Sequence, residues 1–206
     1  MIAARYSRYV VDLNRPADDA DLYPGQTATG LCPVSTFSGE AVYMEDYAPP
    51  VAERVERYWQ PYHDRLQLEL ENIRQRHGYA LLWDAHSILS RVPRLFAGRL
   101  PDLNLGTNSG QSCSAAIESA LVDVLRRQSD YSWIANGRFR GGYITRHYGS
   151  PATNIHAVQL ELTQCNYMDE ETGAYVPERA AQLAACVRSL LETLQRAAAT
   201  AYVSRR

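Results

Sequence analysis

The sequence predicts an α/β fold, because segments with strand and helix character alternate along the chain. The apolar run at 79–83 and the alternating apolar and polar side chains at 156–162 are typical of strands. Residues 51–76 carry apolar side chains at helical spacing, and 177–201 is rich in Ala and Leu. Such alternation is typical of a sheet that packs against helices. The chain has 206 residues, of which 46% are hydrophobic and 21% charged, which is the composition of one globular domain. We therefore expect residues 1–206 to form a single α/β sandwich domain.

The N-terminal part contains a predicted strand, a long loop and a long helix. Tyr9–Leu13 is a short β-branched run and is expected to form a buried strand. Residues 18–50 are rich in Gly, Pro, Asp and Thr, which predicts an irregular segment, and long loops of this kind are usually functional. Val51–Arg76 is expected to form a helix that is kinked near Pro61 and closed by Gly78.

The middle of the chain contains a predicted strand that runs into polar residues. Tyr79–Trp83 is a continuous apolar run, typical of a central strand that is buried on both faces. Asp84–Ser87 follows it and is expected at the carboxyl end of the strand, where open α/β sheets bind ligands. Asn, Gly and Ser in 104–114 predict a loop, and 114–128 predicts the next helix.

Three further elements are expected in the C-terminal part. Residues 137–142 predict a loop that enters a short strand at Tyr143–Thr145. His156–Leu162 alternates apolar and polar side chains, which predicts a strand with Gln159 and Glu161 on one face. Pro177–Ala201 is rich in Ala and Leu and is expected to form the closing helix.

Charge and cysteine usage favour a cytoplasmic protein with a small-molecule partner. The net charge is −2, with no basic run that would suit nucleic acid or an anionic membrane surface. No stretch approaches the roughly 20 apolar residues that span a bilayer. Four widely spaced cysteines without a C-x-x-C pair are typical of reduced thiols in the cytoplasm.

His86 is a candidate metal ligand. A histidine at the end of a buried strand, between Asp84 and Ser87, can be oriented by hydrogen bonds from its neighbours. Imidazole is a good ligand for zinc. The alternative is a buried histidine whose hydrogen bonds are satisfied by Asp84 alone.

Glu161 and Arg15 are the other candidate functional residues. Glu161 lies inside an apolar strand, where a carboxylate is costly unless it is paired or used. It is therefore either a general base or the partner of an arginine across the sheet. Arg15, which follows Asn14, suits bidentate binding of a carboxylate, and its alternative is an ordinary surface arginine.

Four basic side chains gather in a Gly-rich stretch, which predicts an anion-binding loop for a carboxylate or a phosphate: Arg138, Arg140, Arg146 and His147. Neither G-x-x-x-x-G-K nor G-x-G-x-x-G accompanies them, which weakens a nucleotide-binding interpretation. Ser87 and Ser112 lack a G-x-S-x-G context, which argues against a serine hydrolase.

Several segments between residue 7 and about residue 170 together carry a resemblance to a known family. They are Ser7–Pro16, Leu22-Tyr23, Asp84–Ser87, Pro93–Phe96, Leu103–Thr107, Gly141–Gly149 and Gln159–Leu162. With these segments the chain resembles the N-formylglutamate amidohydrolases. The resemblance implies metal-dependent hydrolysis of N-formyl-L-glutamate to formate and L-glutamate in histidine degradation, with zinc or another divalent metal. That family is similar in fold to the zinc carboxypeptidases, which implies a three-layer sandwich with a mixed central sheet.

The resemblance also implies roles for individual residues. His86 takes the place of a zinc-binding histidine, and Glu161 that of the glutamate that activates the metal-bound water. Asn14 and Arg15 correspond to the pair that binds the substrate carboxylate. Arg94 and Arg146 are the candidates for the second carboxylate of this small dicarboxylate substrate.

One departure from the family pattern concerns the metal ligands. The family carries a P-H-S-G-type motif before its V-D-L-N-R segment, so we expect the other ligands upstream of Met1 and an N-terminally incomplete domain. His63 and His77 are expected at the surface and not as substitutes. Two alternatives stay open: a related N-acyl amino acid amidohydrolase, or a catalytically inactive dicarboxylate-binding fragment.

Overall fold

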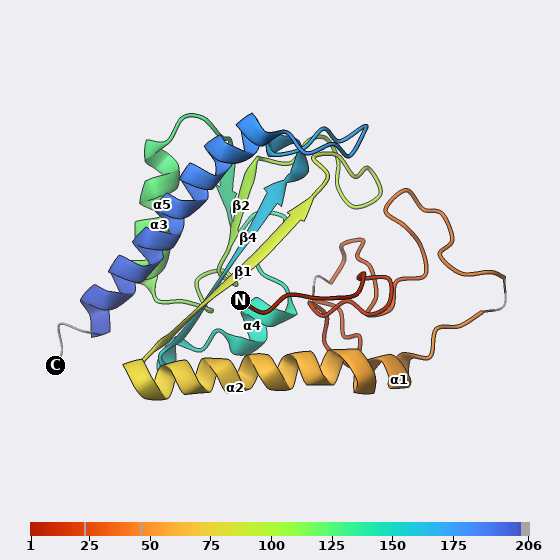
Figure 1. Ribbon diagram of the computed structural model, residues 1–206, viewed down its shortest axis with the longest axis horizontal. Helices are drawn as coiled ribbons and strands as arrows, with labels where there is room; N and C mark the ends of the chain where they lie inside the picture. Colours follow the sequence, from red (N-terminus) through yellow and green to blue (C-terminus); the bar gives the residue numbers. More distant parts are fainter. Residues whose placement is uncertain (23, 46, 203–206) are drawn as a thin grey trace.

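A four-stranded mixed sheet forms the centre of the protein (Figure 1). The computed structural model describes residues 1–22, 24–45 and 47–202, so Tyr23 of the Leu22-Tyr23 motif lies outside the described residues. In the order of the sheet, the strands are β1 (Ala80–Ile88), β4 (Ile155–Thr163), β2 (Leu103–Gly106) and β3 (Trp133–Ala135). β1 is parallel to β4 and β2 to β3, whereas β2 and β4 are antiparallel. The predicted α/β class with a mixed sheet is confirmed.

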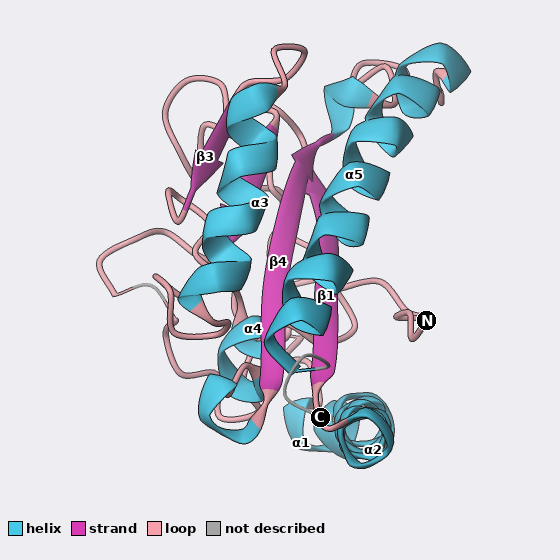
Figure 2. Ribbon diagram, turned by 90° about the vertical axis from the view of Figure 1, so that its left-hand side faces the viewer, coloured by secondary structure: helices cyan, strands magenta, loops and turns pink. Residues whose placement is uncertain are grey.

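Two helices cover one face of the sheet, α3 (Ala115–Arg127) and α5 (Pro177–Tyr202) (Figure 2). Leu121 of α3 and Leu190 of α5 are fully buried against Val158 and Leu160 of β4. The apolar side of each helix thus meets the apolar side of the strand, and this is the largest core of the protein. Both helices were expected from the sequence, and both predictions are confirmed.

The opposite face of the sheet packs against α2 (Gln60–His77) and α4 (Tyr143–Tyr148). Leu66 and Leu70 of α2 join Ile144 of α4 and Ala80 of β1 in a second, smaller core. In Figure 1, α2 crosses the end of the sheet at which β1 begins, which leaves the other end of this face to loops. The two helical layers and the sheet make three layers.

The helix before β1 has an irregular start. α1 (Val51–Arg54) passes into a π-helical turn, η1 (Val55–Trp59), and then into α2. Pro61 has no N–H group to donate to the carbonyl four residues earlier, so a regular α-helix is interrupted here. The irregularity just before Pro61, where the sequence predicts a kink, is this π turn. Gly78 ends α2 with a φ of 83°, as expected.

Residues 9–13 do not form the predicted strand. Val11 is buried as expected, but the Asp12 amide donates to the Leu31 carbonyl in a single loop contact. The Asp12 side chain accepts a hydrogen bond from the Asn14 amide at 3.0 Å, which favours a turn over an extended strand. The prediction was wrong because a short aspartate competes with sheet pairing.

Three other strand predictions need correction. β1 is not central, because β4 lies between it and the rest of the sheet. Asp84 and His86 lie within β1, since the strand continues to Ile88. The segment at 143–145 is the start of α4, because Gly141, with a φ of 114°, turns the chain before the helix begins. β2 and β3 were not predicted, because they are short and β2 contains Asn and Gly.

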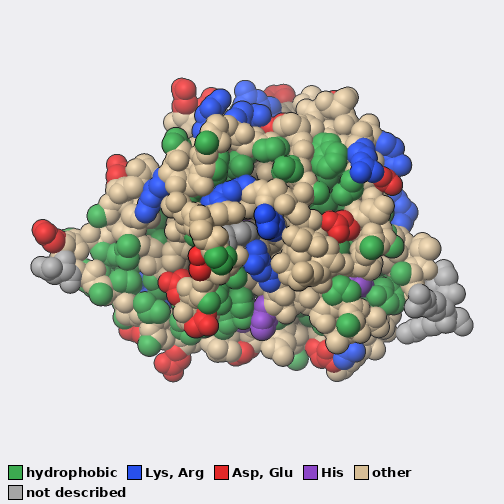
Figure 3. Space-filling view, turned by 180° about the vertical axis from the view of Figure 1, so that it is seen from behind, with side chains coloured by type: hydrophobic (Ala, Val, Ile, Leu, Met, Phe, Trp, Pro, Cys, Tyr) green, Lys and Arg blue, Asp and Glu red, His purple; other side chains and the backbone are tan. Residues whose placement is uncertain are grey.

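The outer surface carries charges of both signs. The face in Figure 3 shows acidic and basic side chains interspersed among uncharged ones. Within the ranges that the structure describes, no helix has the length and apolar character needed to cross a bilayer.

Candidate active site

A row of polar side chains lies on the sheet face opposite α3 and α5. The register of the parallel strands pairs Asp84 with Gln159 and His86 with Glu161. Since alternate residues of a strand point to the same face, all four side chains share one side of the sheet. Asn104 of β2 lies opposite Glu161 and extends the row. Strand alternation thus puts this polar row on the face away from the core under α3 and α5.

A small cavity of about 110 Å³ lies where the N-terminal loop crosses this row. It is lined by Arg8, Asp12, Asn14, Arg15, Leu22, His86, Phe139, Gly142, Gln159 and Glu161. The cavity therefore brings together Asn14, Arg15, His86 and Glu161, which the sequence had singled out over a span of almost the whole chain. Arg15 is half-buried, and among the described residues its guanidinium group has no hydrogen-bond or ion-pair partner.

His86 is held by two polar neighbours through one ring nitrogen. Its Nε2 lies 2.6 Å from Asp84 Oδ1 and 3.1 Å from Asn14 Nδ2. Burial lowers the pKa of His86, but the nearby carboxylates, first that of Asp84 and then that of Glu161, raise it to about 9. With Nε2 facing Asp84, Nδ1 is the ring nitrogen left for a ligand.

Glu161 is buried and has little to satisfy its charge. Within the described part of the chain, the only hydrogen bond to its carboxyl group comes from Gln159 Nε2 to Oε2 at 3.5 Å. No arginine forms an ion pair with it there. Burial raises the pKa of Glu161 to about 7, although the charges of His86 and Arg8 act in the other direction. A carboxyl group with a pKa near neutrality is well suited to accept and return a proton.

Asn14 is tied to the start of α4 by a close backbone approach. Its Oδ1 accepts from the Ile144 amide at 2.8 Å. A Cβ atom at Gly142 would lie only 2.3 Å from Asn14 Nδ2, so a side chain at this position would displace the asparagine. The Gly142 amide in turn donates to Gln159 Oε1 at 2.7 Å. The Gly141-Gly142 pair therefore links the N-terminal loop to the polar row.

The remaining predicted basic residues lie outside the cavity lining. Arg94 donates to the Thr36 carbonyl at 2.6 Å. Arg146 donates to the carbonyls of Gly141 and Leu22 at 2.8 and 2.9 Å. Arg138 likewise donates to a carbonyl of the long loop, at Thr27. The structure thus places these arginines at backbone carbonyls, and Arg140 is exposed.

Two charged residues of the cavity had not been singled out from the sequence, Arg8 and Asp12. They form an ion pair, and Arg8 also donates to Thr29 Oγ1 at 3.0 Å. The sequence could have indicated this ion pair, because the two opposite charges are four residues apart, on either side of residues 9–11. It was missed because 9–13 was expected to form a strand, in which these two side chains would not meet.

The described residues contain one candidate metal ligand, His86, and no cluster that could hold an ion. A histidine whose second nitrogen faces a carboxylate has the arrangement of many metal-binding histidines, so His86 with Asp84 fits that role. In residues 1–22, 24–45 and 47–202, however, no three His, Cys, Asp or Glu side chains come together to hold an ion. A catalytic zinc normally has three protein ligands, so the described residues alone do not fit a catalytic metal.

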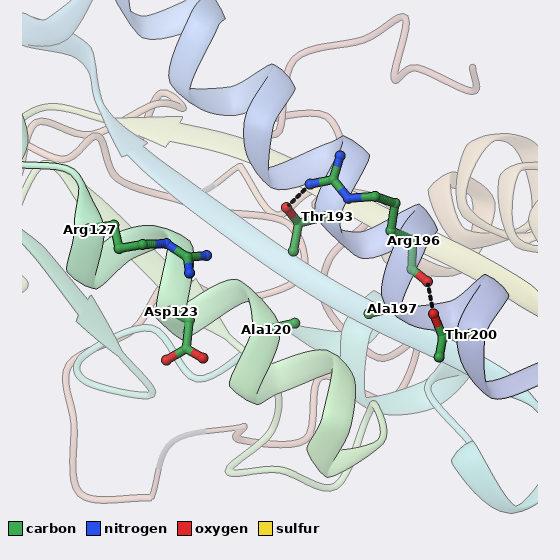
Figure 4. A pocket seen from close by; sticks show the side chains of 7 residues that line it. All are labelled: Ala120, Asp123, Arg127, Thr193, Arg196, Ala197 and Thr200. Carbon is green, nitrogen blue, oxygen red and sulfur yellow. Dashed lines mark hydrogen bonds between the residues drawn. The ribbon is translucent and has the colours of Figure 1, made fainter.

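Another hollow lies between α3 and α5, on the other side of the sheet (Figure 4). It has a volume of about 320 Å³ and includes Asp123, Arg127, Thr193, Arg196 and Thr200 in its lining. Within α5, Arg196 donates to Thr193 Oγ1 at 2.8 Å, and Thr200 Oγ1 donates to the Arg196 carbonyl at 3.0 Å. These local bonds are typical of an exposed helix surface, and the apolar core separates this hollow from the polar row.

The fold and the polar cavity together define the class of protein, an α/β enzyme with a buried carboxyl group and a carboxylate–histidine pair on adjacent parallel strands. Comparison with known sequences gives the family. The N-formylglutamate amidohydrolase family profile matches residues 1–168, and the chain belongs to this family of amide hydrolases.

Two relatives are named N-formylglutamate deformylase. The protein of Pseudomonas aeruginosa is 54% identical over 198 residues, which are 94% of this chain and 74% of that protein. The protein of Pseudomonas putida is 50% identical over the same shares of both chains. The recognition of the family from the sequence is therefore confirmed.

Two solved structures are similar to the fold. The N-formylglutamate amidohydrolase of Ralstonia eutropha JMP134 has a TM-score of 0.74 at 26% identity, covering 98% of this chain and 77% of that one. A protein of Agrobacterium tumefaciens has a TM-score of 0.64 at 18% identity, covering 93% and 69%, and supports the fold alone.

Proposed function

We propose that this chain hydrolyses N-formyl-L-glutamate to formate and L-glutamate. The observation that carries the proposal is the cavity in which Arg15, whose guanidinium has no partner among the described residues, lies with the buried carboxyl group of Glu161. A guanidinium group binds a substrate carboxylate, and a carboxyl group that titrates near neutrality moves a proton. The names of the two Pseudomonas relatives support the choice of substrate.

The proposed reaction uses Glu161 as the general base and acid. Glu161 takes a proton from water while the water oxygen bonds to the formyl carbon, and it returns that proton to the nitrogen as the C–N bond breaks. Arg15 holds one carboxylate of the substrate, and the Asn14 amide lies beside it. Arg94 and Arg146 remain candidates for the second carboxylate, although both donate to backbone carbonyls here.

Metal dependence is a separate part of the proposal. His86 is proposed as one ligand of zinc or another divalent ion, supported by the carboxylate of Asp84 behind its ring. The other donors would come from outside the described residues. The test is zinc stoichiometry measured by atomic absorption: His86→Ala should lose bound zinc, whereas His77→Ala, on the end of α2, should keep it.

The cellular compartment is inferred from the cysteines of the chain, and the pathway from the products of the proposed reaction. Four free cysteines support a reducing compartment, and we place the activity in the cytoplasm. Formate and glutamate are products expected at the end of an amino-acid breakdown route, for which we propose histidine degradation.

The direct test is formate release from N-formyl-L-glutamate, with and without added zinc, beside N-acetyl- and N-succinyl-L-glutamate. A cavity of about 110 Å³ favours the smallest acyl group, so the formyl compound should be cleaved best. Preferred cleavage of a larger acyl group would replace the substrate by a related N-acyl amino acid. Binding of L-glutamate without any cleavage would favour a dicarboxylate-binding protein instead.

A further inference from the structure

The segment Leu13–Arg15 lies outside any strand, yet the carbonyls of all three of its residues are bonded. The Leu13 carbonyl lies 2.9 Å from His63 Nε2. The Arg15 carbonyl accepts from Trp59 Nε1 at 2.8 Å. Between them, the Asn14 carbonyl accepts from the Tyr143 amide at 3.2 Å. Donors from η1, α2 and α4 therefore provide the hydrogen bonds to these carbonyls that neighbouring strands would provide in a sheet.

The two ring donors lie side by side where the π turn passes into α2, because they are four residues apart on one helix face. Trp59 is the last residue of η1, and the Gln60 amide bonds to the Val55 carbonyl five residues back. The rings of Trp59 and His63 are in contact with their centroids 3.9 Å apart, and both side chains are buried. π turns inside helices are frequent at functional sites, because they redirect side chains that an α-helix would place elsewhere.

His63 has the protonation state that such a donor requires. A carbonyl oxygen only accepts, so Nε2 carries the proton toward Leu13. In the neutral ring Nδ1 is then an acceptor, and it lies 2.9 Å from Tyr148 Oη, which also donates to the His63 carbonyl at 3.1 Å. Burial lowers the pKa of His63 to about 4, which keeps the ring neutral near pH 7. His63 was expected at the surface, and that prediction is wrong, since only 4% of the residue is exposed.

We infer that Trp59 and His63 are positioning residues that hold Asn14 and Arg15 over the polar row. Neither side chain lines the cavity, and both act through backbone carbonyls on either side of Asn14. The amide of Asn14 reaches His86, and Arg15 lines the cavity, so a shift of this segment displaces both. The inference rests on the carboxylate-binding role proposed for Arg15.

Trp59→Phe is the primary test, because it keeps an aromatic ring and removes the Nε1 donor. Trp133→Phe on β3 is the matched control, since the Trp133 ring packs against the other core and has no hydrogen-bond partner among the described residues. Binding of L-glutamate is measured by calorimetry, and the exchange of amide hydrogens in peptides that cover 12–16 by mass spectrometry.

We expect Trp59→Phe to weaken glutamate binding by about tenfold, the effect of one lost hydrogen bond, and to speed exchange at 12–16. Trp133→Phe should change neither. His63→Gln, which retains an N–H donor, should weaken binding less than His63→Leu.

Unchanged exchange and unchanged binding in Trp59→Phe would overturn the inference. Faster exchange with unchanged glutamate affinity would show that Trp59 holds the loop but that Arg15 does not bind the carboxylate, which would overturn the proposed role of Arg15. Arg15→Ala distinguishes these cases, because it should abolish binding without changing exchange at 12–16.

Discussion

The apolar core under α3 and α5 and the polar row on the opposite face of the sheet differ in chemical character. The face under α3 and α5 is lined by aliphatic side chains such as Leu105 and Leu160, which are fully buried. On the opposite face, β1 carries Asp84 and His86, and β4 carries Glu161. One strand therefore contributes to a stabilising core with half of its residues and to a polar site with the other half.

The difference shows that side chains on one side of a strand stabilise the fold, whereas those on its other side form the candidate active site. Burying the aliphatic face removes apolar surface from water and favours folding. Burying the carboxyl group of Glu161 with only one long hydrogen bond opposes folding. A side chain that costs stability in the interior is a candidate for function, and this is the reason to assign the chemistry to the polar face.

The largest expected effect is the loss of hydrolysis in Glu161→Gln. Glutamine keeps the shape of the side chain but neither accepts nor returns the proton, so kcat for formate release should fall by about 10²- to 10⁴-fold. The KM for N-formyl-L-glutamate should change little, because Arg15 is untouched. Undiminished kcat in this variant would assign the proton transfer to another group.

Leu121→Ala tests whether a change in the apolar core alters stability without altering ligand binding at the polar row. Leu121 is fully buried between α3 and the sheet, so its truncation should reduce the free energy of unfolding by about 2–5 kcal/mol. Urea denaturation measures this loss, and glutamate binding below the transition should stay close to that of the unchanged protein. Equal losses of stability and affinity would mean that the two faces are not independent.

Acid should destabilise the protein through His63. Its pKa is about 4 in the folded protein, against an ordinary value of 6.5 for an unfolded chain, so the unfolded chain binds the extra proton between these values. Stability is complete above the higher pKa and falls as the pH drops toward the lower one, by up to about 3 kcal/mol. His63→Gln should flatten this part of the curve of unfolding free energy against pH. An unchanged acid slope would refute the neutral, buried state of His63.

The smallest effect is expected at the start of α3. Ser114 caps the helix by accepting a hydrogen bond from the Ile117 amide at 3.4 Å. Ser114→Ala should reduce the free energy of unfolding by about 1 kcal/mol, with no effect on formate release. A measurable loss of activity would connect α3 to the polar face.

The sequence predicted the elements that carry a clear periodicity. α2 and β4 were expected because their apolar residues recur at the spacing of a helix or a strand, and β4 put Glu161 and Gln159 on one face. α5 was expected from its content of Ala and Leu. The same alternation, once β1 and β4 are paired, aligns His86 with Glu161. Fold class and the centre of the candidate site could therefore be predicted from local patterns.

The loop at 9–16 could not be predicted, because its partners lie far away in the sequence. The donors to Leu13 and Arg15 come from His63 and Trp59, and no local pattern indicates that a tryptophan and a histidine on a helix bond to a loop more than 40 residues earlier. For the same reason the spacing within α2 did not reveal that His63 is buried. Arg8 and Asp12 were missed because the segment was expected to be extended.

The most direct test of the separation between the two faces is the stability of Glu161→Gln as a function of pH. The pKa of Glu161 is about 7 in the folded protein, against an ordinary value of 4.5 for an unfolded chain, so the folded protein holds the extra proton between these values. The cost of the buried charge is absent at low pH, grows as the pH rises and is complete above the folded pKa. The variant should therefore be more stable than the unchanged protein by about 1–3 kcal/mol near pH 8 and nearly equal below about pH 4.5. A variant that is less stable near pH 8 would show that Glu161 supports the fold, and would contradict the assignment of the polar face to function.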